Sequence, residues 1–215
     1  GRSKTLFDLG DAEFVSRLST VRRALYLLFN EGYHGASAVS AVRVELCAEA
    51  MRLTGLLRGF PPAATPTTDA LAALMCLHAA RLPARIDTAG DLSPLQDQDR
   101  SRWDARLIAE GLALLERSAA GDEVTGYHIE AAIAVEHAGA RSLEETDWQS
   151  IVSLYDKLMD IDPSPVVALN RAIAIGQRDG AERGLEELHA IADRDRLSNY
   201  PFYPAALGEL ELRRG

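Results

Sequence analysis

Lysine, cysteine and long apolar runs are scarce in this sequence of 215 residues. Lys4 and Lys157 are the only lysines, so arginine carries almost all of the positive charge. The two cysteines, Cys47 and Cys76, lie far apart without a CxxC partner, which favours small buried thiols in a reducing compartment. No apolar run approaches the roughly 20 residues that span a bilayer, and no signal peptide is seen. We therefore expect a cytoplasmic protein without membrane contact.

Positive charge is also in short supply, because the formal net charge is -9 at pH 7. Proteins that bind nucleic acids need a basic stripe that displaces counterions from phosphates. We therefore expect no direct nucleic-acid contact from this chain. Its hydrophobic content of 47% with 26% charged residues is that of an ordinary globular protein. The length suffices for one large core or for a series of stacked helix pairs.

Motifs for catalysis and for cofactor binding are missing as well. The sequence contains no GxxxxGK[ST], GxSxG or HExxH motif and no GxGxxG after a strand, and its five histidines are scattered. Asp97, Asp99 and Ser101 imitate the first ligands of a calcium loop. However, Arg102 stands where glycine is required, and Ile108 where a bidentate glutamate belongs. We predict no metal site, no cofactor and no enzymatic activity.

Helical periodicity dominates what is present, because apolar residues recur at steps of three and four. We expect nine helices. Six of them cover residues 12–31, 39–58, 67–82, 127–138, 181–192 and 201–214, and three more carry Trp103 to Leu114, Trp148 to Leu158 and Val166 to Ile173. Gly111 lies inside one of these helices, where glycine costs about 1 kcal/mol relative to alanine. We therefore expect another helix to approach closely at Gly111.

Several residues have the character of helix ends. Gly32 and Gly35 would end the first helix, and Thr67 or Thr68 would cap the third. The segment Thr146-Asp-Trp-Gln149 has the form of a capping box, in which the threonine hydroxyl and the glutamine side chain satisfy amides at the helix start. Ser164-Pro165 is a suitable N-cap and first-turn pair.

The second half of the chain has signs of a repeat. Residues 155–163, YDKLMDIDP, resemble the end of a tetratricopeptide unit, and the endings QRDG and LRRG lie about 34 residues apart. We predict an all-α fold of stacked antiparallel helix hairpins in a tetratricopeptide-like right-handed superhelix. It forms a single helical-repeat domain over 1–215, with a linker or tag at 1–11, irregular helix pairs at 12–119 and repeats at 120–215. Leu207, Leu210 and Leu212 then lack a partner helix, so we expect the native protein to continue.

The helical period stops in the segment RLPARIDTAGDLSPLQDQDRSRWD, residues 81–104. We expect a short polar insertion around residues 83–100, for which a β-hairpin with a turn at 89–91 is one interpretation. The segment is either a solvated loop with Asp99 as an N-cap and Trp103 in the core, or a network of ion pairs and hydrogen bonds that docks a partner. Candidate binding residues, for a protein contact or a ligand site, are Glu31, Tyr33, Arg81, Arg85, Asp87, Gln98, Asp99, Arg100 and Trp103.

Three passages carry a family resemblance: LYLLFNEGY (25–33), DQDRSRWDARLIAEGLALLERS (97–118) and DWQSIVSLYDKLMDIDPSPVVALNRAIAI (147–175). They resemble the C-terminal tetratricopeptide-like extension of a group of bacterial extracytoplasmic-function (ECF) sigma factors. In that family the extension follows two small helical domains that bind RNA polymerase and read the promoter.

The resemblance implies a role in transcription initiation, with the sigma factor's own N-terminal domains and RNA polymerase as partners. The extension would dock on them, and Glu31, Arg85, Asp99, Arg100 and Trp103 are our candidates for contacting the partner or for shaping the contact surface. A second hypothesis is a ligand-sensing module that holds a small molecule or peptide against the insertion. A third is an enzyme with a small substrate, for which the sequence offers no nucleophile–base pair.

Overall fold

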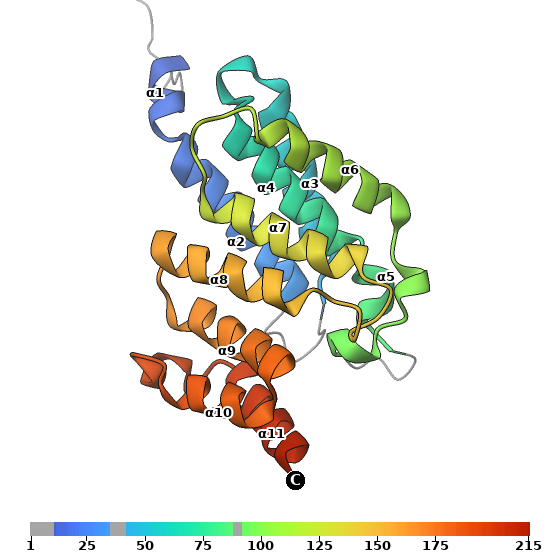
Figure 1. Cartoon of the computed structure of the whole chain (residues 1–215). Coiled ribbons are helices and arrows are strands. Elements are labelled where there is room, and N and C mark those ends of the chain that lie inside the picture. The colour runs from blue at the N-terminus through green and yellow to red at the C-terminus, as the bar shows by residue number, and fades with distance from the viewer. Residues whose placement is uncertain (1–10, 35–41, 88–91) are drawn as a thin grey trace, which may run out of the picture. The chain divides into compact units, whose positions relative to one another are not determined.

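A computed structural model of the chain describes residues 11–34, 42–87 and 92–215. The fold is all-α, as predicted (Figure 1). Within the described ranges no strand forms, and the insertion holds a single antiparallel bridge between Ile86 and Leu92 in place of a β-hairpin. The predicted turn at 89–91 lies outside the described residues. The superhelix and its hand stay predictions.

None of the helices in the described ranges combines the length and the apolar character needed to cross a membrane. The contacts divide the chain into two compact units, residues 1–131 and 132–215, and the boundary falls within α7 (Gly126–Gly139). The two units are described in turn.

The first unit is built around α4 (Pro66–Ala79), which is apolar on nearly every side. Eleven of its 14 residues are buried, as expected of a helix that is surrounded by other elements. Its neighbours are α2 (Leu18–His34), α3 (Val44–Gly59) and α6 (Ala105–Ser118), which pack against it. The core of this unit combines side chains from α2, α3 and α4, among them Leu25, Phe29, Ala50, Leu71 and Met75.

Two glycines allow these helices to approach closely. A Cβ atom at Gly111 of α6 would lie 2.7 Å from Leu77 Cγ and 3.2 Å from the Ala73 carbonyl oxygen of α4, which confirms the close approach predicted there. A Cβ atom at Gly32 of α2 would lie 2.8 Å from both the Arg43 carbonyl oxygen and the Cys47 amide nitrogen. Gly32 therefore serves helix packing and does not end its helix, contrary to the prediction, and Gly35, the other predicted helix end, lies outside the described residues.

Both cysteines are buried, as predicted. The side chain of Cys47 is fully buried, and that of Cys76 is 5% exposed. The Cys47 thiol donates a hydrogen bond to the Phe29 carbonyl oxygen over 3.6 Å. Burial raises the pKa of Cys47 to about 11 and that of Cys76 to about 12, so both thiols stay protonated at neutral pH.

Helix ends differ from the prediction at several places. The helix predicted over 12–31 is broken at Arg17 into α1 (Asp11–Ser16) and α2, which continues to His34. The helix predicted from residue 39 begins at Val44. Thr65, one residue before Pro66, caps α4 by accepting a hydrogen bond from the Thr68 amide. The predicted caps Thr67 and Thr68 were wrong. Proline favours the first position of a helix, so α4 begins at Pro66 and its cap is the residue before it.

The second unit contains α8 (Trp148–Ile161), α9 (Pro165–Asp179), α10 (Ala181–His189) and α11 (Phe202–Arg214) (Figure 1). Successive helices of this series pack on each other, as hairpins do. A Cβ atom at Gly184 of α10 would lie 2.7 Å from the Gly176 Cα atom of α9. Gly180 turns the chain between these two helices with φ of 101°, a left-handed conformation that favours glycine.

The end of α11 is better packed than predicted. Leu210 is buried and Leu207 is half-buried, and both join a core with Leu169, Leu185 and Leu188. The side chain of Leu212, by contrast, is 85% exposed. The expectation that all three leucines lack a partner was therefore wrong for two of them, because α9 and α10 already cover this face.

One of the two predicted caps in this unit is confirmed. The Ser164 hydroxyl accepts a hydrogen bond from the Val167 amide at the start of α9. At the start of α8, however, the N-cap is Asp147, whose carboxylate accepts from the Ser150 amide over 2.9 Å. The Thr146 hydroxyl donates to the Ser142 carbonyl oxygen in the preceding loop, so the capping box beginning at Thr146 was wrong by one residue.

Candidate functional site

The candidate site of the first unit lies where α4 ends. One further helical turn, α5 (Leu82–Arg85), places Arg81 at its start and Arg85 at its last position. The chain then passes through the insertion and returns to α6 (Figure 1). The bridge of Ile86 with Leu92, and a hydrogen bond from the Ser93 amide to the Arg85 carbonyl oxygen, hold the insertion against α5.

Arg85 packs on the end of α2. Its guanidinium carbon lies 4.0 Å from the centre of the Tyr33 ring, in the position of a cation–π contact. Its Nε donates a hydrogen bond to the Tyr33 carbonyl oxygen over 3.0 Å, and its Nη2 lies 3.4 Å from Nδ1 of His34. The side chain of Arg85 is only 8% exposed and that of Tyr33 2%. The contact therefore anchors α5 to a helix that lies 52 residues earlier in the chain.

Arg81 packs on Gln98 and Trp103, which follow the insertion's predicted turn in the sequence. Its Nε donates to the Gln98 side-chain oxygen over 3.3 Å, and the Gln98 amide donates to the Ser93 carbonyl oxygen over 2.9 Å. The guanidinium carbons of Arg81 and Arg100 lie 5.3 Å and 4.9 Å from the Trp103 ring centre. Gln98 and Trp103 are buried, so the insertion has a small interior of its own.

Two aspartates fix the path back to α6. The Asp99 carboxylate accepts hydrogen bonds from the amide and the hydroxyl of Ser101, at 2.9 and 2.6 Å, and thereby caps a short 3-10 turn at Arg100–Arg102. Asp104 caps α6 itself by accepting from the amides of Arg106 and Leu107. Its own amide donates to the Ala80 carbonyl oxygen. One interpretation of the sequence made Asp99 an N-cap. It is one, but it caps the 3-10 turn at Arg100–Arg102, whereas α6 is capped by Asp104.

The predicted residues fall into three groups. Tyr33 and Arg85 form one contact, and Arg81, Gln98, Arg100 and Trp103 form a second. The third group, Asp87, Asp99 and Glu31, is exposed. We call these two contacts, together with His34, the arginine cluster: Tyr33, His34, Arg81, Arg85, Gln98, Arg100 and Trp103.

Two histidines near Tyr33 escaped the sequence-based selection. His34 has an exposed side chain and contacts Arg85. The ring of His78 on α4, three residues before Arg81, lies 5.0 Å from the Tyr33 ring in an edge-on arrangement. The sequence could have pointed to both histidines, because His34 directly follows Tyr33 and His78 lies three residues before Arg81.

The electrostatics of the cluster are those of excess positive charge. Burial lowers the pKa of Arg85, and the neighbouring charge of Arg81 acts in the same direction. The surrounding protein and the charges of Arg85 and Arg81 lower the pKa of His34 to about 4, although its side chain keeps an exposed surface. His34 is therefore neutral at pH 7, and its Nδ1 can accept a hydrogen bond from Arg85.

This arrangement is suited to binding more than to proton transfer. A general acid or base works best when its pKa lies near the working pH, and that of His34 lies well below it. The nearby Cys47 thiol, with its raised pKa, is a poor nucleophile. What the cluster presents is a set of guanidinium and aromatic donors, with Arg81 half-buried and His34 exposed at its solvent side.

Comparison with known proteins finds a family model that matches the part of the chain holding the arginine cluster. Residues 17–119 match the model of a family of unknown function (DUF6596), and this range contains every residue of the arginine cluster. An uncharacterized protein of Rhizobium meliloti, R00370, is 41% identical over 211 residues. The match covers 97% of this chain and 49% of that protein, so the chain spans about half the length of its curated relative. No solved structure matches the chain significantly.

Proposed function

We propose that this chain is the regulatory and interaction domain of an ECF sigma factor, and that it docks on the sigma domains or on RNA polymerase during transcription initiation. The observation that carries the proposal is the meeting of two of the passages that resemble this family. Residues 25–33 supply Tyr33, and residues 97–118 supply Gln98 and Trp103. They come together through Arg81 and Arg85 of α5, so the family resemblance and the arginine cluster coincide.

The third passage supports the same proposal from the second unit. Residues 147–175 form α8 and the greater part of α9, a helix hairpin that begins with the Asp147 cap and turns at Ser164. Helix hairpins stacked in series present surfaces that bind protein segments. About half of the Rhizobium protein lies outside the match, which leaves room for the two helical domains that the family places before its extension.

A protein surface suits the proposed docking better than nucleic acid. The net charge of -9 opposes approach to phosphates. Within the first unit, Arg81, Asp99 and Glu31 offer exposed or half-exposed charge of both signs for contacts with a partner. Buried Trp103, Gln98 and Arg85 would set the shape of that surface, not touch the partner.

A binding experiment tests the docking. The purified chain would be immobilised, and the half of the Rhizobium protein outside the match, as well as core RNA polymerase, would be passed over it. We expect saturable binding of at least one of them, weakened by Arg81→Gln and Asp99→Ala. The control is Arg52→Gln, because Arg52 is exposed on α3 and pairs with Glu49 of its own helix. Absence of binding to both partners would defeat the docking proposal.

The ligand-sensing hypothesis has one observation in its favour. Arg85 is buried, and in the described part of the first unit no carboxylate lies within ion-pair distance of it. A ligand that supplied the missing negative charge would be held between α2, α5 and the insertion, and could change how the insertion is presented to a partner.

A further inference from the structure

We propose that the arginine cluster is a binding site for an oxyanion, a carboxylate or phosphate group that pairs with Arg81 and Arg85. The proposal goes beyond a role in transcription, and it stands or fails on the geometry of these arginines alone. The proposed site needs neither a catalytic residue nor a metal ion.

The first argument is the missing counter-charge. A buried ionised group is normally paired, because removal of a charge from water is costly. Arg58, a half-buried arginine of the first unit, has such a partner in Asp69, at 2.6 Å. Arg85 is more deeply buried, yet among the described residues its partners are a carbonyl oxygen, a neutral imidazole and an aromatic face.

The second argument is the number of free donors. A guanidinium has five N–H groups, and the hydrogen bonds to Tyr33 and His34 use two of those on Arg85. Three remain without an acceptor in the described part of the chain. Arg81 uses only its Nε, in the bond to Gln98. The buried Tyr33 hydroxyl also lacks a hydrogen-bond partner there. These groups can all donate hydrogen bonds, and an oxyanion offers the acceptors that they lack.

The third argument is placement. Arg81 precedes α5 and Arg85 ends it, so the two residues are four positions, or about one helical turn, apart. Arg85 contacts His34 directly, and the charges of Arg85 and Arg81 both contribute to the lowered pKa of His34. Exposed His34 and half-buried Arg81 leave the solvent side open to a small group.

A contrasting arginine in the second unit shows what a satisfied site looks like. Arg171 bonds to Asp156 at 2.6 Å and to Glu187 at 2.7 Å. Burial alone would lower the pKa of Arg171, but these two carboxylates raise it above its ordinary value. At Arg85 the net effect is the opposite, because no such group is present among its described neighbours. A bound oxyanion would give Arg85 the environment that Arg171 already has.

Titration of the purified chain with sodium phosphate and, separately, with sodium acetate tests the proposal. Ionic strength is held constant with sodium chloride, and the arginine Nε–H resonances are followed by ¹H–¹⁵N NMR. We expect saturable shifts of the Arg85 and Arg81 resonances. Tighter binding of acetate would identify a carboxylate, such as an acidic side chain, and tighter binding of phosphate would identify a phosphorylated compound.

Two variants and a control sharpen the result. Arg85→Gln should abolish saturable binding, and Arg81→Gln should weaken it by on the order of tenfold or more, the worth of a hydrogen bond to a charged group. Arg81 is half-buried, so its variant keeps the test valid if Arg85→Gln does not fold. Arg52→Gln removes the same charge from an exposed position and should change nothing. Shifts that never saturate, or that are equal in the Arg81 and Arg52 variants, would overturn the proposal.

Discussion

The close approach of α6 to α4 at Gly111 can be tested by one added methyl group. In Gly111→Ala the new Cβ would lie 2.7 Å from Leu77 Cγ, which belongs to a side chain that is 1% exposed. The Ala73 carbonyl oxygen would lie 3.2 Å away and cannot turn aside, because it belongs to a helix backbone. Overpacking of this kind costs about 1–3 kcal/mol, whereas alanine in a helix gains about 1 kcal/mol over glycine. The net result should be a loss of up to about 2 kcal/mol in unfolding free energy.

Gly55→Ala is the matched control, since Gly55 lies inside α3 and nothing lies within 4 Å of its added Cβ. It should gain about 1 kcal/mol, so the two variants should differ by about 1–3 kcal/mol. Urea unfolding, followed by Trp103 fluorescence in a Trp148→Phe background, measures the stability of the first unit. Equal stabilisation by both alanines would refute the packing of α6 on α4.

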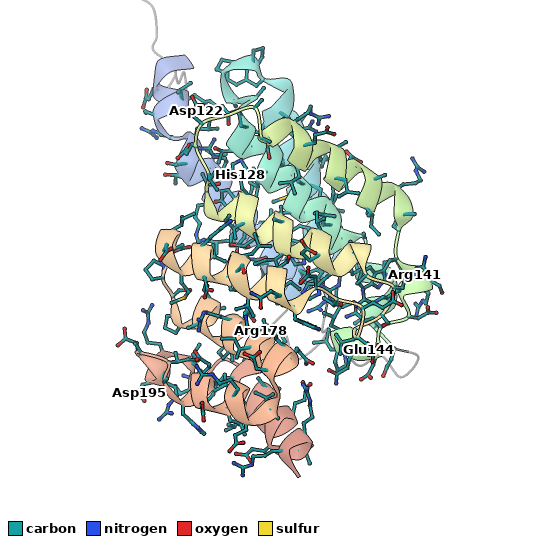
Figure 2. The ribbon with its side chains drawn as sticks, viewed as in Figure 1. Asp122, His128, Arg141, Glu144, Arg178 and Asp195 are labelled. Carbon is teal, nitrogen blue, oxygen red and sulfur yellow. The ribbon has the colours of Figure 1, made fainter. Side chains whose placement is uncertain are left out.

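Three further predictions concern local features. Gly184→Ala should destabilise the second unit, because its Cβ would meet the Gly176 backbone at 2.7 Å, whereas Gly208→Ala meets nothing within 4 Å and should not; urea unfolding followed by Trp148 fluorescence distinguishes them. Asp147→Ala should cost about 0.5–2 kcal/mol in the same assay through loss of the α8 cap, and an unchanged midpoint would contradict that role. His128 (Figure 2) accepts a hydrogen bond from the Thr125 amide, and burial lowers its pKa below the usual 6.5. The unfolded chain therefore binds a proton at His128 more readily than the folded one, so the free energy of unfolding should be highest above about pH 6.5 and fall as the pH drops below it. His128→Asn, which can accept the same bond, should lose part of this slope in urea unfolding between pH 7 and pH 4; an unaltered slope would be the contrary result.

Features written in local sequence were predicted well. The all-α fold follows from helical periodicity, and the burial of both cysteines from their apolar character. The Ser164 cap follows from the Ser-Pro pair, and the close approach at Gly111 from a glycine inside a helix. Errors came where two local rules competed. Gly32 can end a helix or admit a neighbour, and only the position of α3 decides between the two. Thr146 and Asp147 are both good caps, and the loop acceptor at Ser142 decides the choice.

The sequence predicted most residues of the candidate site but not how they contact one another. Arg81, Gln98 and Trp103 lie close in sequence, so their contact was within reach of local reasoning. Tyr33 and Arg85 meet across 52 residues because α2 and α5 both border α4. No sequence pattern states that Arg85 becomes buried without a carboxylate, since burial is a property of the packed helices. His34 was missed although it directly follows Tyr33 in the sequence.

The most direct test of the central claim uses the full-length Rhizobium protein, about half of which this chain resembles. The protein would be mixed with core RNA polymerase and genomic DNA, and the 5′ ends of the transcripts would be mapped by sequencing. The sigma-factor account predicts binding to core polymerase and new transcripts from discrete sites that share an upstream sequence. Deletion of the half that matches this chain should change their amount. A protein that neither binds core polymerase nor adds any start site would contradict the account.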